Sequence, residues 1–90
     1  MIVRYSKKAL KFLAKQNAVT VSRIREGIQG LTQVPPVGDI KQMQGRSDGM
    51  MRLRVGGYRI LFFYSIEEQN MQQIEILMIT EIGNRGDIYK

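Results

Sequence analysis

Three arginines lie close together in the stretch "MMRLRVGGYRILFFY", residues 50–64. Arg52 and Arg54 are separated by one residue, and Arg59 follows after a Gly-Gly pair. A guanidinium group stays charged near neutral pH and can form paired hydrogen bonds to a phosphate or a carboxylate. The cluster is therefore suited to holding an anion and stabilising negative charge, and it is poorly suited to removing a proton.

The Gly-Gly pair predicts the strands that position these arginines. Two glycines between two runs of β-forming residues favour a tight hairpin turn, because glycine accepts a positive φ. This turn fixes the register and places Arg54 opposite Arg59 and Arg52 opposite Leu61. Because side chains alternate along a strand, the three arginines share one face with Leu61 and Phe63. The other face, which we predict to be the core face, carries Met51, Leu53, Val55, Tyr58, Ile60 and Phe62.

Two interpretations of the arginine-bearing face are open. Arg54 and Arg59 are predicted to lie directly opposite each other, and like charges so placed destabilise a sheet. The long side chains could diverge over a solvated face, where water and salt screen the charges. Alternatively, the guanidinium groups bind phosphate, and the apolar Leu61 and Phe63 beside them suit base stacking or a protein partner.

The composition narrows the chemistry further. The chain has 90 residues, 43% of them hydrophobic, which suits one domain spanning residues 1–90. Its 14 Lys and Arg against 8 Asp and Glu give a net charge of +6, which favours nucleic acid or another polyanion as partner. It has no cysteine and no histidine, so disulfides and thiolate metal sites are excluded. Proton transfer would therefore rely on carboxylates, lysines, tyrosines or the substrate.

The N-terminal sequence "MIVRYSKKALKF" lacks the layout of an export signal. The longest apolar run, "ILFFY", is far shorter than the roughly 18 residues that a membrane-spanning helix needs. We therefore expect a soluble protein with no membrane partner, and the lack of cysteine makes the reducing cytoplasm its default location.

The whole chain is expected to form an α+β domain. The expected elements, in chain order, are a strand at 1–5, a helix after an N-cap at Ser6, a second helix from an N-cap at Thr20 to Gln33, a loop at 36–49, and strands at 50–55, 58–66 and 71–82. Helices before a run of consecutive strands predict an antiparallel sheet with a helical hairpin packed on one face. The first strand must pair non-locally. Gly27 and Gly30 indicate that the second helix depends on tertiary packing or lies close against its neighbour helix.

Three segments, "GDIKQMQG", "RLRVGGYRILF" and "ITEIGNRGDIYK", together resemble the RelE toxins of bacterial toxin–antitoxin pairs, within the RelE/ParE superfamily. The similarity extends over nearly the whole chain, including the order of a helix pair followed by three strands. It implies a RelE-like, microbial-ribonuclease-like fold. It also implies a ribosome-dependent messenger RNA endoribonuclease that works without metal and is neutralised by a cognate antitoxin.

The resemblance also assigns catalytic positions. It matches Arg52 to a basic residue on the first hairpin strand, Arg59 to the arginine after the hairpin tyrosine, Arg85 to a Gly-x-Arg turn and Tyr89 to a near-terminal tyrosine. Met50 departs from the family, because well-studied members carry a lysine there. Cleavage through the 2′-hydroxyl needs a proton removed, charge on phosphorus stabilised and the 5′ oxygen protonated. We assign Arg59 and Arg85 to the phosphate, with Arg85 also a candidate to assist the leaving oxygen. Tyr89 is assigned to proton transfer, since neighbouring cations favour its phenolate.

Other residues have weaker assignments. Arg54 is expected to contact RNA or the antitoxin, and Tyr89 could instead anchor the chain end by packing. Tyr58 is expected to pack on the core face. Lys7, Lys11 and Lys15 are spaced four apart and would either meet RNA backbone or form a solvated stripe on one helix face. The scattered carboxylates Glu75, Glu81 and Asp87 are a weak metal signal, so we predict no metal and no cofactor.

Three functions stay open at this point. The first is the ribosome-dependent endoribonuclease, for which Arg52, Arg59, Arg85 and Tyr89 together supply a chemical reason. The second is a ParE-like toxin that inhibits DNA gyrase by protein binding, and the third is a non-catalytic RNA-binding module. The expected partners are ribosome and messenger RNA, and a RelB-like antitoxin whose acidic segment folds on the toxin and allows a hetero-oligomer.

Overall fold

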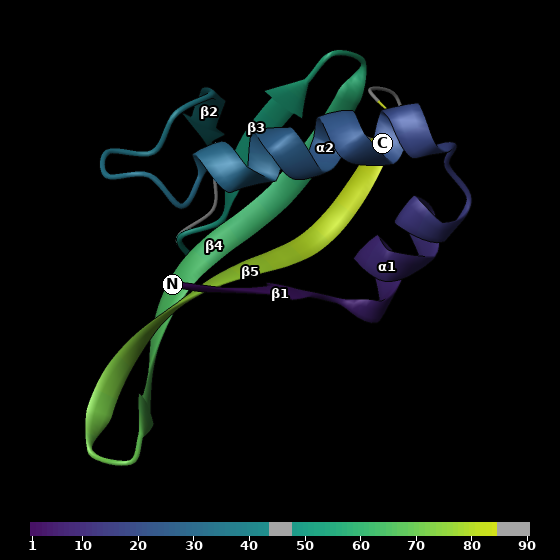
Figure 1. Cartoon of the computed structure of the whole chain (residues 1–90). Coiled ribbons are helices and arrows are strands. Elements are labelled where there is room, and N and C mark those ends of the chain that lie inside the picture. The colour runs from purple at the N-terminus through teal and green to yellow at the C-terminus, as the bar shows by residue number, and fades with distance from the viewer. Residues whose placement is uncertain (44–47, 85–90) are drawn as a thin grey trace.

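The computed structural model describes residues 1–43 and 48–84 of the chain. The elements in chain order are β1 (Ile2–Tyr5), α1 (Lys7–Ala14), α2 (Ala18–Gly30), β2 (Asp39–Gln42), β3 (Met51–Val55), β4 (Tyr58–Gln69) and β5 (Gln72–Asn84). This is the expected α+β fold, with two helices between the first strand and the rest of the sheet (Figure 1). No helix within the described residues is long and apolar enough to cross a membrane.

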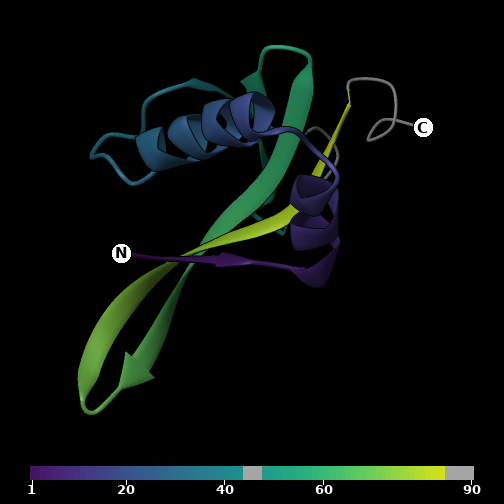
Figure 2. The same cartoon turned by 45° about the vertical axis from the view of Figure 1, so that its right-hand side comes forward.

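The five strands form one sheet in the order β1-β5-β4-β3-β2. Every neighbouring pair is antiparallel except β1, which runs parallel to β5 and pairs its Ile2 with Ile76. This resolves the non-local pairing that the sequence left open. The paired strands β4 and β5 are much longer than the others, and their hairpin projects beyond the rest of the sheet (Figures 1 and 2).

Both helices pack on one face of the sheet, over the predicted core face of the β3–β4 hairpin. Leu53, Ile60 and Phe62 are each 1% exposed or less. The other fully or nearly fully buried members of this core are Ala9, Ile24, Ile28, Leu31, Leu77, Ile79 and Ile82. Burying a large aliphatic or aromatic side chain contributes about 1.5–3 kcal/mol, so each of these side chains stabilises the fold.

The helix starts follow local capping chemistry. Ser6 caps α1 as predicted, because its Oγ accepts a hydrogen bond from the Ala9 backbone N–H at 3.0 Å. The predicted Thr20 cap was wrong. Asn17 caps α2, and its Oδ1 accepts a hydrogen bond from the Thr20 backbone N–H at 2.8 Å. The apolar spacing begins only at Val21, so it did not reveal the first turn of this helix.

The two glycines of α2 allow close packing, as their positions predicted. A Cβ at Gly27 would lie 2.6 Å from Val55 Cγ2, and a Cβ at Gly30 would lie 2.6 Å from the Val37 carbonyl oxygen. The close neighbours are therefore β3 and the segment before β2. The suggestion that these glycines pack against the other helix was wrong.

The predicted loop at 36–49 contains a strand. β2 pairs antiparallel with β3, with Ile40 opposite Leu53 and Lys41 opposite Arg52. The short sequence "DIKQ" has one apolar residue, Ile40, which packs against the core. A four-residue strand with a single apolar position has little local signal, so its pairing with β3 stabilises it.

Candidate functional site

The arginines occupy the face of the sheet that no helix covers. The β3–β4 register is the predicted one, with Arg54 opposite Arg59 and Arg52 opposite Leu61. Gly56 in the turn has a φ of 57°, which explains the need for glycine there. Because the core face points toward the helices, the alternation of side chains directs all three arginines to the opposite side.

Strand β2 adds two charged residues to this face. Asp39 lies opposite Arg54, and Lys41 lies opposite Arg52. Residues directly opposite each other in an antiparallel pair lie on the same face, about 5 Å apart at Cβ. We refer to the resulting surface as the arginine face, and it is made up of Asp39, Lys41, Arg52, Arg54, Arg59 and Leu61.

Burial divides the three arginines. Arg52 is 7% exposed and Arg59 is 5% exposed, whereas Arg54 is exposed. The interpretation of a simply solvated face was therefore wrong for Arg52 and Arg59 and holds for Arg54. Burying a charged group is costly unless an opposite charge or hydrogen bonds compensate it.

The compensation for these two buried cations is weak within the described residues. Arg52 Nη1 lies 3.8 Å from Asp39 Oδ1, and the Asp39 side chain is 53% exposed. Arg59 Nη1 donates to the Tyr58 carbonyl oxygen at 3.4 Å, and no carboxylate of residues 1–43 or 48–84 lies within 4.0 Å of its guanidinium group. This arrangement favours an incoming anion, whose charge would offset the cost of burying the arginines.

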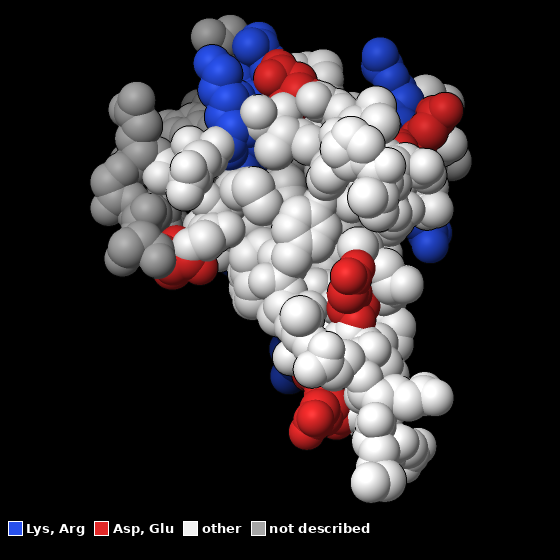
Figure 3. Space-filling view, turned by 90° about the vertical axis from the view of Figure 1, so that its left-hand side faces the viewer, with Lys and Arg blue, Asp and Glu red and all other residues white. Residues whose placement is uncertain are grey.

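Surface charge is unevenly distributed along the molecule. In a view onto the β2 edge, lysine and arginine side chains gather at the end that carries the β3–β4 turn (Figure 3). The projecting β4–β5 hairpin shows mainly acidic and uncharged side chains in the same view. On this face of the molecule, the basic side chains are therefore concentrated at one end, where acidic side chains also occur.

The structure does not bring all the predicted site residues together. Arg85 and Tyr89 lie outside the described residues, so their predicted roles stay predictions. Lys7, Lys11 and Lys15 are exposed on α1 and at its C-cap. Because Ala9 of α1 packs in the core, this helix covers the opposite side of the sheet from the arginine face.

The structure also describes the surroundings of one predicted core tyrosine and one of the scattered carboxylates. Tyr58 packs against the core, with its ring 6.0 Å from that of Phe12, as expected for a core-face tyrosine. Glu81 forms an ion pair with Lys8, and its Oε1 lies 2.8 Å from Lys8 Nζ. No group of three metal-ligating side chains occurs in the described part of the chain.

Sequence reasoning missed Asp39 and Lys41 as members of the site. The signal was present in weak form, because Asp39 and Lys41 flank Ile40 with the two-residue period of a half-buried strand. It also missed that Met50 Sδ lies 3.6 Å from Thr80 Oγ1.

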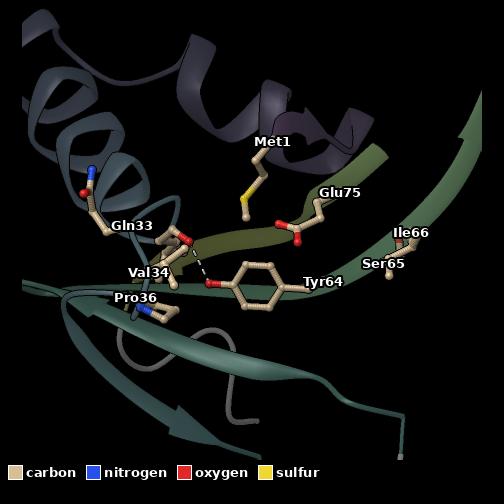
Figure 4. A pocket seen from close by; sticks show the side chains of 9 residues that line it. Met1, Gln33, Val34, Pro36, Tyr64, Ser65, Ile66 and Glu75 are labelled. Atoms are coloured by element: carbon tan, nitrogen blue, oxygen red, sulfur yellow. Dashed lines mark hydrogen bonds between the residues drawn. The ribbon is translucent and has the colours of Figure 1, made fainter. Parts of the chain in front are cut away.

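A pocket lies on the helix-bearing side of the sheet. It is a pocket of about 330 Å³ between the segment after α2 and the β4–β5 hairpin, and Figure 4 shows its lining. Its lining residues are Met1, Leu31, Gln33, Val34, Pro36, Tyr64, Ser65, Ile66 and Glu75. The Tyr64 hydroxyl donates to the Leu31 carbonyl oxygen at 2.8 Å, and burial raises the pKa of Tyr64. The pocket is mostly apolar and lies away from the arginines.

No protein-family model matches the sequence, and no curated protein matches it. Solved structures do match, and two of them are similar over nearly the whole length of both chains. The RelB–RelE antitoxin–toxin complex of Methanococcus jannaschii has a chain 25% identical, covering 94% of this chain and 93% of that one with a TM-score of 0.63. The RelBE2 toxin–antitoxin complex of Mycobacterium tuberculosis has a chain 21% identical, covering 93% and 96%, with a TM-score of 0.66. The fold expected from the sequence motifs is confirmed.

Proposed function

We propose that this chain, a RelE-type toxin by its fold and its structural neighbours, is the toxin of a toxin–antitoxin module. Its activity in this proposal is ribosome-dependent cleavage of messenger RNA, carried by one domain over residues 1–90. The observation that carries the proposal is the pair of buried, weakly compensated cations, Arg52 and Arg59, on the helix-free face. A protein that only needed solubility would leave such groups in water.

The arginine face suits the electrostatic part of RNA cleavage. Attack of a 2′-hydroxyl on the adjacent phosphorus places extra negative charge on the phosphate oxygens. Arg52 and Arg59 can donate paired hydrogen bonds to those oxygens, and their charge does not depend on pH near neutrality. Arg54 is exposed beside them and, in this proposal, contacts the flanking phosphates. The positive charge that a metal would bring is supplied here by guanidinium groups.

The residue assigned to proton transfer, Tyr89, lies outside the residues that the structure describes. In this proposal Tyr89 removes the 2′-hydroxyl proton, and Arg85 joins the phosphate contacts, as the family resemblance implies. Lys7, Lys11 and Lys15 lie on a different surface from the arginine face. They would therefore contact ribosomal RNA backbone at a distance from the cleaved bond.

The proposed protein partner is a RelB-like antitoxin. Both structural neighbours are antitoxin–toxin complexes. An acidic segment of such a partner would cover the arginine face and compensate Arg52, Arg54 and Arg59 in place of RNA. The toxin and antitoxin would then form a hetero-oligomer in which cleavage is blocked by occupancy of the same surface.

A primer-extension assay on a defined message tests the proposed reaction. Cleavage within the translated region is expected when purified ribosomes are present, and no cleavage is expected on naked RNA. Addition of the protein encoded by the adjacent reading frame should abolish it. Translation arrest with intact message would reject the endoribonuclease, and a DNA supercoiling assay would then distinguish gyrase inhibition from simple RNA binding.

A further inference from the structure

The strand that the sequence did not predict places an amine beside the arginines. Lys41 lies directly opposite Arg52 in the β2–β3 pair, so both side chains are on the helix-free face. Lys41 is exposed at the outer strand of the sheet, whereas Arg52 is buried beside it. All other lysines among residues 1–43 and 48–84 lie on α1 or at its C-cap. Lys41 is therefore the one amine on the described part of the sheet.

An amine adds chemistry that the neighbouring arginines lack. A guanidinium group stays charged near neutral pH and is a poor proton donor to a leaving group. An ammonium group has three N–H donors and is a stronger acid that can give up a proton. The flexible lysine side chain can also reach over the β2–β3 pair toward a phosphate held at Arg52 and Arg59. The site thus combines fixed positive charge on β3 and β4 with one mobile, transferable proton on β2.

We propose that Lys41 is a catalytic residue that contacts the RNA and protonates the leaving 5′ oxygen. This inference rests on the proposed function. The 2′ oxygen forms a bond to phosphorus and loses its proton to a base, either water or a phenolate. The bond from phosphorus to the 5′ oxygen breaks, and that oxygen takes a proton from the Lys41 ammonium group. The products are a 2′,3′-cyclic phosphate, a 5′-hydroxyl end and a neutral amine that solvent reprotonates.

Two substitutions at this position separate proton transfer from charge. Lys41→Met removes both, while Lys41→Arg keeps the charge and the reach but withholds the proton. Loss of general acid catalysis typically costs at least about 100-fold in rate. Single-turnover cleavage on programmed ribosomes should therefore fall about 100-fold in both variants. Lys8→Met is the matched control, because it removes the same amine from an exposed position on α1 to which the proposal assigns no role.

A modified message supplies the decisive measurement. Replacing the 5′ oxygen at the cleavage site by sulfur creates a leaving thiolate, which needs no protonation. Both Lys41 variants should cleave this message within a few-fold of the wild-type rate. Lys41 is exposed, so both variants should also show the unfolding midpoint of the wild type.

Three outcomes would overturn the inference. Wild-type rates in Lys41→Met would remove Lys41 from the site. Wild-type rates in Lys41→Arg would reduce its role to charge alone. If the Lys41 variants cleave the sulfur-containing message as slowly as the normal one, Lys41 contributes to binding and does not transfer a proton. If the wild-type protein cleaves neither message on ribosomes, the proposed function itself fails, and that result is distinct from the other three.

Discussion

The two sides of the sheet are built from the same strands and satisfy their polar groups in different ways. On the helix-bearing side, the Tyr64 hydroxyl is hydrogen-bonded to the Leu31 carbonyl oxygen and the surrounding surface is mostly apolar. On the arginine face, Arg59 is 5% exposed, close to the most exposed core residue, Ile82 at 4%, but has only a 3.4 Å contact to a neighbouring carbonyl among the described residues. On the second side, the described residues offer Arg52 only a 3.8 Å contact to the exposed Asp39 carboxylate, and none of their carboxylates lies within 4.0 Å of the Arg59 guanidinium group.

This difference indicates where folding and where function are concentrated. A satisfied apolar surface stabilises the fold without a ligand, since each of its polar groups already has a partner. A buried cation without a strong partner costs stability, and it is retained where an anion is bound. Substitutions on the helix-bearing side should therefore change stability, and substitutions on the arginine face should change the cleavage rate.

The largest effect is expected from removing a buried cation of the arginine face. Arg59→Met should lower the rate of ribosome-dependent cleavage by about 100- to 1000-fold, the usual cost of losing one donor to a developing oxyanion. The unfolding midpoint should stay level or rise, because the change removes a buried charge with little compensation. Arg23→Met, on the exposed surface of α2, is the control and should leave cleavage unchanged. Full cleavage by Arg59→Met would contradict the assignment of the face.

The next largest effect is expected from adding a side-chain methyl group to α2 on the helix-bearing side. Gly27→Ala should destabilise the protein by about 1–3 kcal/mol, because the new Cβ would lie 2.6 Å from Val55 Cγ2. This cost exceeds the gain in helix propensity of about 1 kcal/mol. Urea denaturation would measure it. Gly57→Ala is the matched control, since a Cβ there meets nothing within 4 Å. Equal stabilities for the two variants would mean that α2 does not press on β3.

A smaller effect is expected from the pocket hydrogen bond. Tyr64→Phe should cost about 1 kcal/mol, because the Leu31 carbonyl loses its donor, and cleavage should not change. The wild type should also lose stability as pH rises above about 10, since burial raises the pKa of Tyr64 and the unfolded chain ionises first. Denaturation curves at pH 8 and pH 11 measure this loss. A Phe variant with the same alkaline loss would assign it to another group.

The smallest effect should come from an exposed ion pair. Arg4 donates to Glu67 at 2.7 Å, and this hydrogen bond lowers the pKa of the Glu67 carboxyl. Its contribution is present above the unfolded pKa near 4.5 and is lost as pH falls through the lower folded value. Glu67→Gln should therefore differ slightly from the wild type at pH 7 and match it at strongly acidic pH. High salt at pH 7 should also remove the difference, and a salt-independent difference would rule out the ion pair as its cause.

The parts of the fold set by neighbouring residues could be predicted from the sequence. The Gly-Gly turn fixed the pairing of Arg54 with Arg59 because a two-residue loop leaves one register. The apolar spacing of Ile24 and Ile28 identified the buried side of α2 in the same way. Both inferences needed only local stereochemistry.

The parts set by distant residues could not be predicted. β2 is held by its ladder to β3, so "DIKQ" carries too little signal alone, and with it Lys41 was missed. The burial of Arg52 and Arg59 depends on what surrounds them in space, which alternation along the strand does not reveal. Arg85 and Tyr89 rest on the family resemblance, because their positions lie outside the described residues.

The long β4–β5 hairpin has a consequence for how the chain behaves in a crowded solution. β3 pairs with β4 only up to Phe62, and β1 pairs with β5 only from Ile76, so the outer part of the hairpin has two open edges within the described sheet. Open edges invite other chains to add as strands. The exposed, like-charged Glu68 and Glu75 oppose such stacking by repulsion. We therefore expect the acidic end of this basic protein to disfavour edge-to-edge pairing between copies.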